Sequence, residues 1–255
     1  MVKMNRFAVY YAPEPGAFAN AAASWLGWDP VAGVKVGQPV LRGLELAALT
    51  ADPRRYGFHG TLKPPFRLAS GLDLAALGAA LAELAQDLTA VQSPRLEFVA
   101  LEGFLALVPG GDTGSLSPDG DTGSLSPDGD TGSLSDLAAR VVTRLDRFRA
   151  ALTEAEIALR RPHLLTLRQR QLLDRYGYPH VMEEFRFHLT LSGQLTPSRL
   201  ATLLPLAQAH FTPHLPQPFR IADLCLFGEA EDGRFHLLQR HPLGRPVAIT
   251  GAAWG

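Results

Sequence analysis

Two histidine–threonine pairs are the residues of this sequence whose types and spacing best suit chemistry. The pattern Phe-His-x-Thr-Leu occurs at residues 58–62 and again at 187–191. Both copies lie in β-rich segments, and we expect strands over 58–67 and 183–195. Side chains two residues apart on a strand share a face. Each copy therefore presents a histidine and a hydroxyl together, with the apolar residues of the pattern on the opposite, core-facing side.

Two histidines with paired hydroxyls suit the cleavage of a phosphodiester. Imidazole has an unperturbed pKa of about 6.5, so a neutral ring can take a proton from the attacking group while a charged ring gives one to the departing alkoxide. The hydroxyls can hold the non-bridging oxygens, where negative charge accumulates. We therefore predict His59 and His188 as general acid and base, in an order that the sequence leaves open, and Thr61 and Thr190 as phosphate ligands.

Other site chemistries find less support in the sequence. Histidine also binds metals, but neither His-x-Glu-x-x-His nor a cysteine cluster occurs, and Glu183 and Glu184 lie several residues from His188. Gly-rich phosphate loops of the GxxxxGK(S/T) and GxGxxG types are absent, as is a nucleophile elbow. We therefore expect neither a metal nor a cofactor.

The composition is that of a globular protein with balanced charge. Of 255 residues, 46% are hydrophobic, and 24 Lys and Arg face 25 Asp and Glu. This balance disfavours nucleic acid as a partner. The single cysteine, Cys225, excludes an intramolecular disulfide. No apolar run reaches the roughly 20 residues of a membrane helix, and the N-terminal run is too short for a signal sequence. We expect a cytoplasmic protein without membrane contact; its oligomeric state is left open.

Helices and strands follow one another in a repeated order along the chain. Strand propensity, apolar periodicity and capping residues predict the elements. The first half of the chain should form a strand at 6–13, a helix at 16–27, the first motif strand, a helix at 72–88 and a strand pair at 94–109. The second half should form a helix at 135–150, short helices capped by Thr153 and Thr166, the second motif strand, a helix at 197–210 and a strand pair at 220–241. The arginines at 160–175 are interpreted mainly as a solvated helix face.

Each motif strand is thus followed by a helix and then by two strands. We predict an α/β (α+β) chain that forms one bilobal domain over 1–255, with two pseudo-symmetric βαββ lobes and antiparallel sheets around a central cleft. Residues 112–135 hold a nonapeptide repeat, "DTGSLSPDG" twice and then "DTGSLS". Its composition predicts a disordered surface loop, and it lacks the double glycine of calcium-binding β-helix repeats.

At "FHGTLK" and "FHLTLS" the sequence resembles the 2H phosphoesterase superfamily, whose signature is two His-x-Thr/Ser motifs in a pseudo-symmetric bilobal α/β fold. "RRYGFHGTLKPPFRL", "YGYPHVMEEFRFHLTLSG" and the opening "RFAVYYAP" look like the branch associated with phosphonate-utilisation operons. The resemblance covers most of the chain except 112–135. It implies that His59, Thr61, His188 and Thr190 are catalytic positions. The implied reaction is metal-independent cleavage of a small cyclic phosphodiester, such as a phosphoribosyl cyclic phosphate formed after carbon–phosphorus bond cleavage.

The substrate that the resemblance implies carries negative charge at both ends. Cations and hydroxyls near the motifs in sequence are therefore the candidate substrate ligands. Lys63 and Arg186 extend the polar faces of the two expected strands. The full set of candidates is Arg54, Arg55, Tyr56, Lys63, Tyr178 and Arg186.

Two other functions stay open. The same site could act on RNA ends, as a 2′,3′-cyclic phosphodiesterase or a 2′,5′ ligase-like enzyme, although the balanced charge argues against a polyanion. Alternatively, the fold could serve as a non-catalytic nucleotide-binding module. Salt dependence separates the first alternative from a small-molecule enzyme, and substitution of His59 tests the second.

Overall fold

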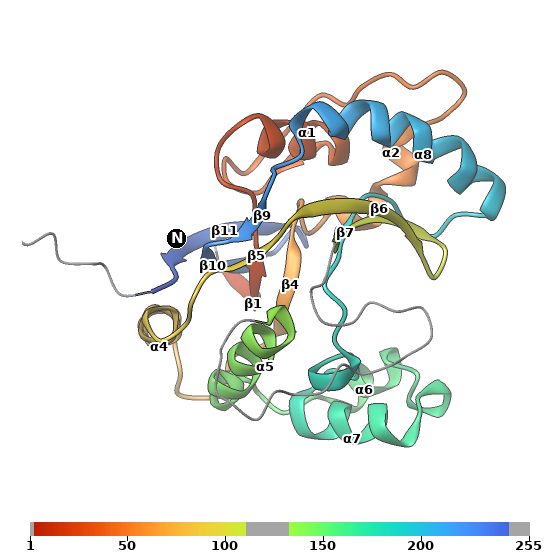
Figure 1. Cartoon of the computed structure of the whole chain (residues 1–255). Helices are drawn as coiled ribbons and strands as arrows, with labels where there is room; N and C mark the ends of the chain where they lie inside the picture. Colours follow the sequence, from red (N-terminus) through yellow and green to blue (C-terminus); the bar gives the residue numbers. More distant parts are fainter. Residues whose placement is uncertain (1–2, 111–132, 245–255) are drawn as a thin grey trace, which may run out of the picture.

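A seven-stranded antiparallel sheet forms the centre of the computed structural model, which describes residues 3–110 and 133–244 (Figure 1). Its strand order is β11-β10-β1-β4-β8-β7-β6. The strands are β1 (Met4–Tyr11), β4 (Gly60–Phe66), β6 (Arg95–Leu101), β7 (Phe104–Gly110), β8 (Leu189–Thr190), β10 (Asp223–Ala230) and β11 (Phe235–Pro242). Two short pairs complete the strands described, β2 (Trp28–Asp29) with β3 (Val34–Lys35), and β5 (Val91–Ser93) with β9 (Phe219–Ile221).

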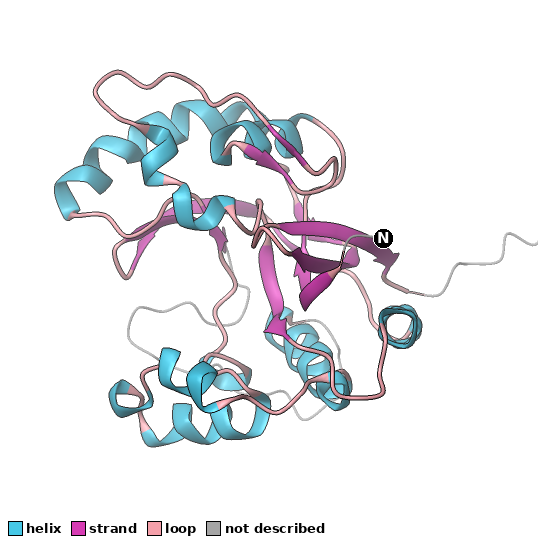
Figure 2. Cartoon of the chain, turned by 180° about the vertical axis from the view of Figure 1, so that it is seen from behind, coloured by secondary structure: helices cyan, strands magenta, loops and turns pink. Residues whose placement is uncertain are grey.

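Helices lie on both sides of this sheet. Figures 1 and 2 show α1, α2 and α8 on one side, and α4, α5, α6 and α7 on the other. Their bounds are α1 (Ala17–Leu26), α2 (Leu46–Leu49), α3 (Ala51–Arg54), α4 (Leu74–Gln86), α5 (Leu134–Arg144), α6 (Glu154–Leu159), α7 (Leu167–Tyr176) and α8 (Pro197–Phe211). The structure therefore confirms the predicted α/β (α+β) fold class with antiparallel strands.

Two of the helices begin with the capping boxes that the sequence predicts. Thr153 accepts a hydrogen bond from the backbone of Glu156, whose side chain accepts one from the backbone of Thr153. Thr166 and Gln169 form the same reciprocal pair at the start of α7. Each box satisfies backbone donors that a helix start leaves free. The starts of α6 and α7 are therefore fixed locally.

The two motif strands are neighbours at the centre of the sheet, where Gly60 of β4 pairs with Leu189 of β8. Hairpin β6–β7 follows the first motif in sequence but pairs with β8, and hairpin β10–β11 follows the second motif but joins β4 through β1. The expected tandem of two βαββ units is thus interleaved. Helices α4 and α8, of 13 and 15 residues, each span about 20 Å and connect a motif strand to the opposite half of the sheet.

The second motif forms less strand than the sequence predicts. Residues 182–184 form a 3-10 turn, 185–188 are extended but unpaired, and β8 has two residues. The reason is that β4 pairs with β8 only at Gly60 and afterwards follows β1 alone. The alternation of faces persists all the same, because Phe187, Leu189 and Leu191 are buried while His188 is partly exposed.

The repeat segment lies mostly outside the described residues, which resume at 133. Residues 133–135, expected to belong to the loop, start α5 instead. Ser133 is the N-cap of this helix, and its hydroxyl accepts a hydrogen bond from the backbone of Asp136. A serine followed by an acidic residue in the first turn favours a helix start. Residues 133–135 also belong to the nonapeptide repeat, so the repeat pattern predicted a loop there.

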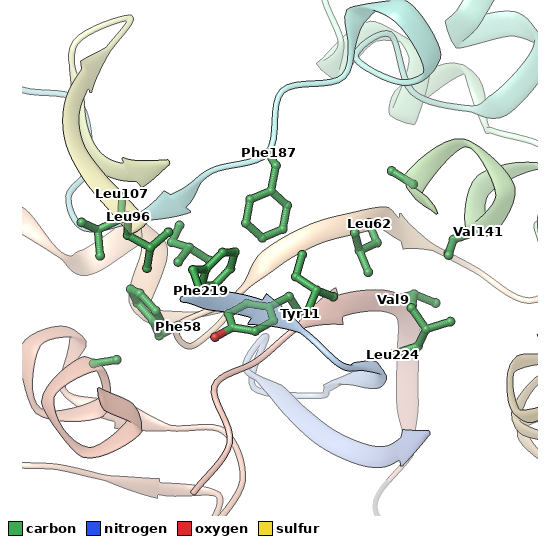
Figure 3. Close-up of a cluster of buried hydrophobic side chains, with 14 of the residues drawn as sticks. Val9, Tyr11, Phe58, Leu62, Leu96, Leu107, Val141, Phe187, Phe219 and Leu224 are labelled. Carbon is green, nitrogen blue, oxygen red and sulfur yellow. The ribbon is translucent and has the colours of Figure 1, made fainter. Parts of the chain in front are cut away.

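A continuous apolar core joins the motif strands to both helical layers. Figure 3 shows Tyr11, Phe187 and Phe219 packed against one another, and Val141 of α5 in the same cluster, on the side of Leu62. Hydrogen bonds from the opposite layer hold the second motif as well. The Trp25 indole donates to the Leu191 carbonyl at 2.8 Å. The motif backbone is therefore anchored from several sides.

Cys225 is a buried free thiol. Among the described residues, no helix is both long and apolar enough to cross a membrane.

Candidate active site

The two motif histidines have the same hydrogen-bond geometry. His59 Nδ1 lies 2.8 Å from the Gly57 carbonyl oxygen, and His188 Nδ1 lies 2.8 Å from the Arg186 carbonyl oxygen. A carbonyl only accepts, so each Nδ1 carries the proton and each Nε2 keeps a lone pair. Both rings line one cavity of about 760 Å³. The structure therefore brings together two imidazoles in the same tautomer, and neither Nε2 has a hydrogen-bond partner within residues 3–110 and 133–244.

His59 sits among aromatic rings. The Tyr10 ring is tilted against it at a centroid distance of 4.0 Å, and the Tyr56 ring lies at 5.7 Å. Burial lowers the pKa of His59 to about 4, against the opposing effect of its bond to the Gly57 carbonyl. The charge of His188 makes a smaller contribution to the same lowering. His59 is thus neutral at pH 7.

His188 has one aromatic neighbour and one acidic neighbour. Phe104 lies beside it at a centroid distance of 5.4 Å. Burial lowers the pKa of His188, while its bond to the Arg186 carbonyl and the negative charge of Glu102 act in the opposite direction. The free site therefore holds two neutral imidazoles, and one of them must gain a proton before it can act as an acid. A bound phosphate favours that proton, because a nearby anion stabilises imidazolium.

The motif threonines line the same cavity as the histidines. Thr61 pairs with Tyr10 of β1, and Thr190 pairs with Ala106 of β7. Both side chains are partly exposed, and neither hydroxyl has a hydrogen-bond partner among the described residues. These hydroxyls are available to donate to an anion. The four predicted catalytic side chains thus face one cavity.

Lys63 does not present its ammonium to the cavity, although its side chain lines the cavity. It is 1% exposed, and its Nζ donates to the Val142 carbonyl at 3.2 Å and lies 3.6 Å from Asp146 Oδ1. The register with β1 shifts between Thr61 and Lys63, so the expected common face is lost. This corrects the substrate-binding assignment. Burial lowers the pKa of Lys63 to about 8.

Arg54 and Arg55 lie outside the cavity lining, and this corrects two further assignments. Arg54 donates to the carbonyls of Leu26 and Ala47, both at 2.6 Å, so it holds α1 and α2 together. Arg55 is exposed, and its guanidinium lies 3.8 Å from Glu229. Both arginines were predicted as substrate ligands because they are close to the first motif in sequence. A turn at Gly57, however, separates them from His59.

Tyr56, Tyr178 and Arg186 do line the cavity, as predicted from their positions. The Tyr56 ring is stacked on Phe235 at 5.0 Å. Arg186 is exposed and has no ion pair with a described residue. These three side chains are therefore free to meet a ligand.

Sequence reasoning missed several cations of the cavity because they come from distant segments. Arg6 of β1 makes a bidentate pair with Glu229, at 2.5 and 2.6 Å. Arg160, at the end of α6, lies over the Tyr178 ring at 4.7 Å. In total, six cationic and four carboxylate side chains line the cavity. Four of the six cations are paired with carboxylates: Arg6 with Glu229, Lys63 and Arg149 with Asp146, and Arg67 with Glu156. Arg160, the member of the arginine run at 160–175 that lines the cavity, and Arg186 have no carboxylate partner among the described residues, and their charges suit an anionic ligand.

No group of three or more metal-ligating side chains occurs among the described residues. Arg168, which belongs to the same arginine run, forms an ion pair with Glu183 instead of facing the cavity.

Comparison with known proteins places the chain in a family. The family named "Protein of unknown function (DUF1045)" matches residues 61–118 and 115–236. Two curated relatives are named "Ribose 1,5-bisphosphate phosphokinase PhnN". The one from Janthinobacterium sp. (strain Marseille) is 37% identical over 215 residues, 82% of this chain and 44% of the relative. The one from Laribacter hongkongensis (strain HLHK9) is 34% identical over 229 residues, which are 89% of this chain and 49% of the relative.

The chain thus spans about half the length of these relatives. A solved structure titled "Crystal structure of phosphoesterase" covers 95% of this chain, and this chain covers all of it, at 14% identity and a TM-score of 0.35. That likeness is too weak to carry an argument. The family match includes Thr61 and the whole second motif, and it extends over more than half of the sequence. The chain belongs to the family of proteins of unknown function called DUF1045.

Proposed function

We propose that this protein is a metal-independent phosphoesterase that opens a small phosphoribosyl cyclic phosphate. The observation that carries the proposal is the twin geometry of His59 and His188, whose rings line one cavity and whose Nε2 atoms have no hydrogen-bond partner among the described residues. Two imidazoles of equal tautomer can exchange the roles of base and acid. The size of the cavity, about 760 Å³, fits a small molecule.

In the proposed reaction, one neutral Nε2 takes a proton from water as the water oxygen bonds to phosphorus. The second imidazole, protonated in the substrate complex, gives its Nε2 proton to the ribose oxygen as the phosphorus–oxygen bond breaks. Thr61 and Thr190 donate to the non-bridging oxygens, which gain negative charge in the transition state. Arg186 supplies a positive charge close by.

The names of the relatives support a ribosyl substrate. A kinase that acts on ribose 1,5-bisphosphate needs a site for the nucleotide, and this chain has no GxxxxGK(S/T) loop. We therefore propose that the part of the relatives that matches this chain has an activity of its own, on a molecule chemically related to ribose 1,5-bisphosphate. If water attacks the phosphorus of a 1,2-cyclic phosphate of ribose 5-phosphate and the bond from phosphorus to the oxygen on ribose carbon 2 breaks, the product is ribose 1,5-bisphosphate. This product would then be the substrate that the relatives' name gives.

A panel of cyclic esters tests the proposal. Purified protein in EDTA is incubated with phosphoribosyl 1,2-cyclic phosphate and, separately, with a 2′,3′-cyclic nucleotide and an RNA that ends in a 2′,3′-cyclic phosphate. We expect turnover of the ribosyl ester, with only a weak dependence on salt. Preference for RNA, with a log–log salt slope steeper than about −3, would move the function to RNA ends. Loss of turnover in EDTA, restored by a divalent metal, would contradict the metal-free mechanism.

A further inference from the structure

We infer that the His59 side of the cavity contains a subsite for a phosphate monoester, formed by Arg160 and the hydroxyls of Tyr10, Tyr56 and Tyr178. The inference rests on the proposed function, because it assigns the end of the substrate that is not cleaved. The subsite would take the terminal phosphate of a sugar phosphate. It would thereby select phosphorylated ribosyl esters over plain ones.

Arg160 is placed by a chain of contacts that begins at β4. Arg67, the residue after this strand, makes a bidentate pair with Glu156 of α6 at 2.9 and 2.8 Å. Arg160 is the C-cap of the same short helix, and its guanidinium lies 4.7 Å from the centroid of the Tyr178 ring. A guanidinium that rests on an aromatic face keeps its edge free for hydrogen bonds. Arg160 is therefore held in position beside the cavity.

The charge of Arg160 is not neutralised by the protein. Among residues 3–110 and 133–244, no carboxylate pairs with Arg160. By contrast, Arg67, Arg149 and Arg6 are paired with Glu156, Asp146 and Glu229 respectively. Charge-assisted hydrogen bonds from a planar guanidinium are well suited to phosphate oxygens. Of the cations on the His59 side, Arg160 thus keeps a full charge for a ligand.

Three tyrosines complete this side of the cavity. Tyr10 and Tyr56 contact the His59 ring. Burial raises the pKa of Tyr10 and of Tyr178; the nearby phenols of Tyr56 and Tyr178 add to the effect on Tyr10, and that of Tyr56 adds to the effect on Tyr178. None of the three hydroxyls has a hydrogen-bond partner in the described parts of the chain, and all three residues line the cavity. Among the described residues, Arg234 Nη1 is the buried side-chain N or O atom that lacks a partner, so the three tyrosine hydroxyls are open to the cavity and not buried. Three unpartnered donors on this side can therefore donate hydrogen bonds to an oxygen-rich ligand.

The His188 side offers a different surface. Glu102 and Phe104 line the cavity there, and Glu102 influences His188 by its negative charge. A carboxylate repels a dianionic phosphate, and a phenylalanine ring offers it no donor. Arg186 also lines the cavity on this side, and the proposed reaction assigns its charge to the phosphate that is cleaved. Arg160 is thus the unpaired cation that remains for the terminal phosphate, at the His59 end.

Isothermal titration calorimetry of the full chain tests the subsite without requiring turnover. The probes are ribose 5-phosphate and ribose, and the variants are Arg160→Gln and Tyr178→Phe. Tyr178→Phe keeps the ring that supports Arg160 and removes only the hydroxyl. Arg144→Gln is the control, because Arg144 is an exposed arginine on α5 outside the cavity lining. Thermal unfolding of each variant checks that it is folded.

We expect ribose 5-phosphate to bind the parent protein at least about tenfold more tightly than ribose does. Arg160→Gln should weaken that binding at least about tenfold and Tyr178→Phe roughly fivefold, with Arg144→Gln unchanged. Equal binding of both probes, or parent-like binding of ribose 5-phosphate by folded Arg160→Gln and Tyr178→Phe, would overturn the subsite. If the expected pattern appears but no cyclic ester is cleaved, the subsite stands and the proposed hydrolysis falls.

Discussion

The Phe187 ring covers Gly60, the residue between the histidine and the threonine of the first motif. A Cβ atom built on Gly60 would overlap Cζ and Cε2 of Phe187 and would lie 3.1 Å from Leu189 Cδ2. Both of these neighbours belong to the second motif. The glycine therefore allows the two motif strands to approach, and this approach places His59 and His188 on one cavity.

Substitution of Gly60 should separate the motifs. The Phe187 ring cannot easily give way, because it is buried and packs against Tyr11 and Phe219. We expect Gly60→Ala to lower the free energy of unfolding by about 1–3 kcal/mol through overpacking, measured by urea denaturation. Gly37→Ala is the matched control, since nothing lies within 4 Å of the added Cβ. Equal stability of the two variants would show that the close contact is not maintained in solution.

If the proposed mechanism is right, His59 and His188 should each be required for turnover. We expect His59→Ala and His188→Ala each to lower kcat at least about 10²-fold, the usual scale of acid–base catalysis. The double variant should lose less than the product of the single effects, because the two rings act as a unit. His163→Ala, an exposed histidine outside the cavity lining, should retain parent activity. A single variant with full activity would remove that histidine from the mechanism.

The motifs could be predicted from the sequence because their information is local. A strand period of two sets which face His59 and Thr61 share, and this holds even where the second motif forms only a short strand. The place of Lys63 could not be predicted, since a shift in pairing with β1 changes its face. Arg160 reaches the site only because α6 is attached to the end of β4 by Arg67 and Glu156, a contact between segments 89 residues apart.

The pH dependence of kcat/KM should reflect the low pKa values of both histidines. The base must be neutral and the acid charged in the free enzyme, and burial lowers the pKa of His59 to about 4 and that of His188 below its ordinary value. Both limbs of the bell-shaped profile should therefore lie below pH 6.5, whichever ring is the base. Initial rates at low substrate between pH 3.5 and 8 measure this. An alkaline limb above pH 6.5 would contradict the neutral pair.

Stability should fall on acidification because the unfolded chain binds a proton that native His59 does not. The folded pKa of His59 is about 4 and its unfolded value about 6.5. Between these values His59 contributes a slope of up to about 1.4 kcal/mol per pH unit, with stability rising as pH rises. Urea unfolding at pH 5 and pH 7 should thus show a smaller difference for His59→Gln than for the parent. His163→Gln should match the parent; an unchanged difference in His59→Gln would mean that His59 titrates normally.

Phosphorus NMR of ring opening tests the central claim most directly. Purified protein and its His59→Ala/His188→Ala variant are each incubated with phosphoribosyl 1,2-cyclic phosphate in EDTA. We expect a 1-phosphate signal to replace the cyclic phosphorus signal with the parent protein only. A cyclic signal that stays unchanged with the parent, or that is lost equally fast with the folded double variant, would contradict it.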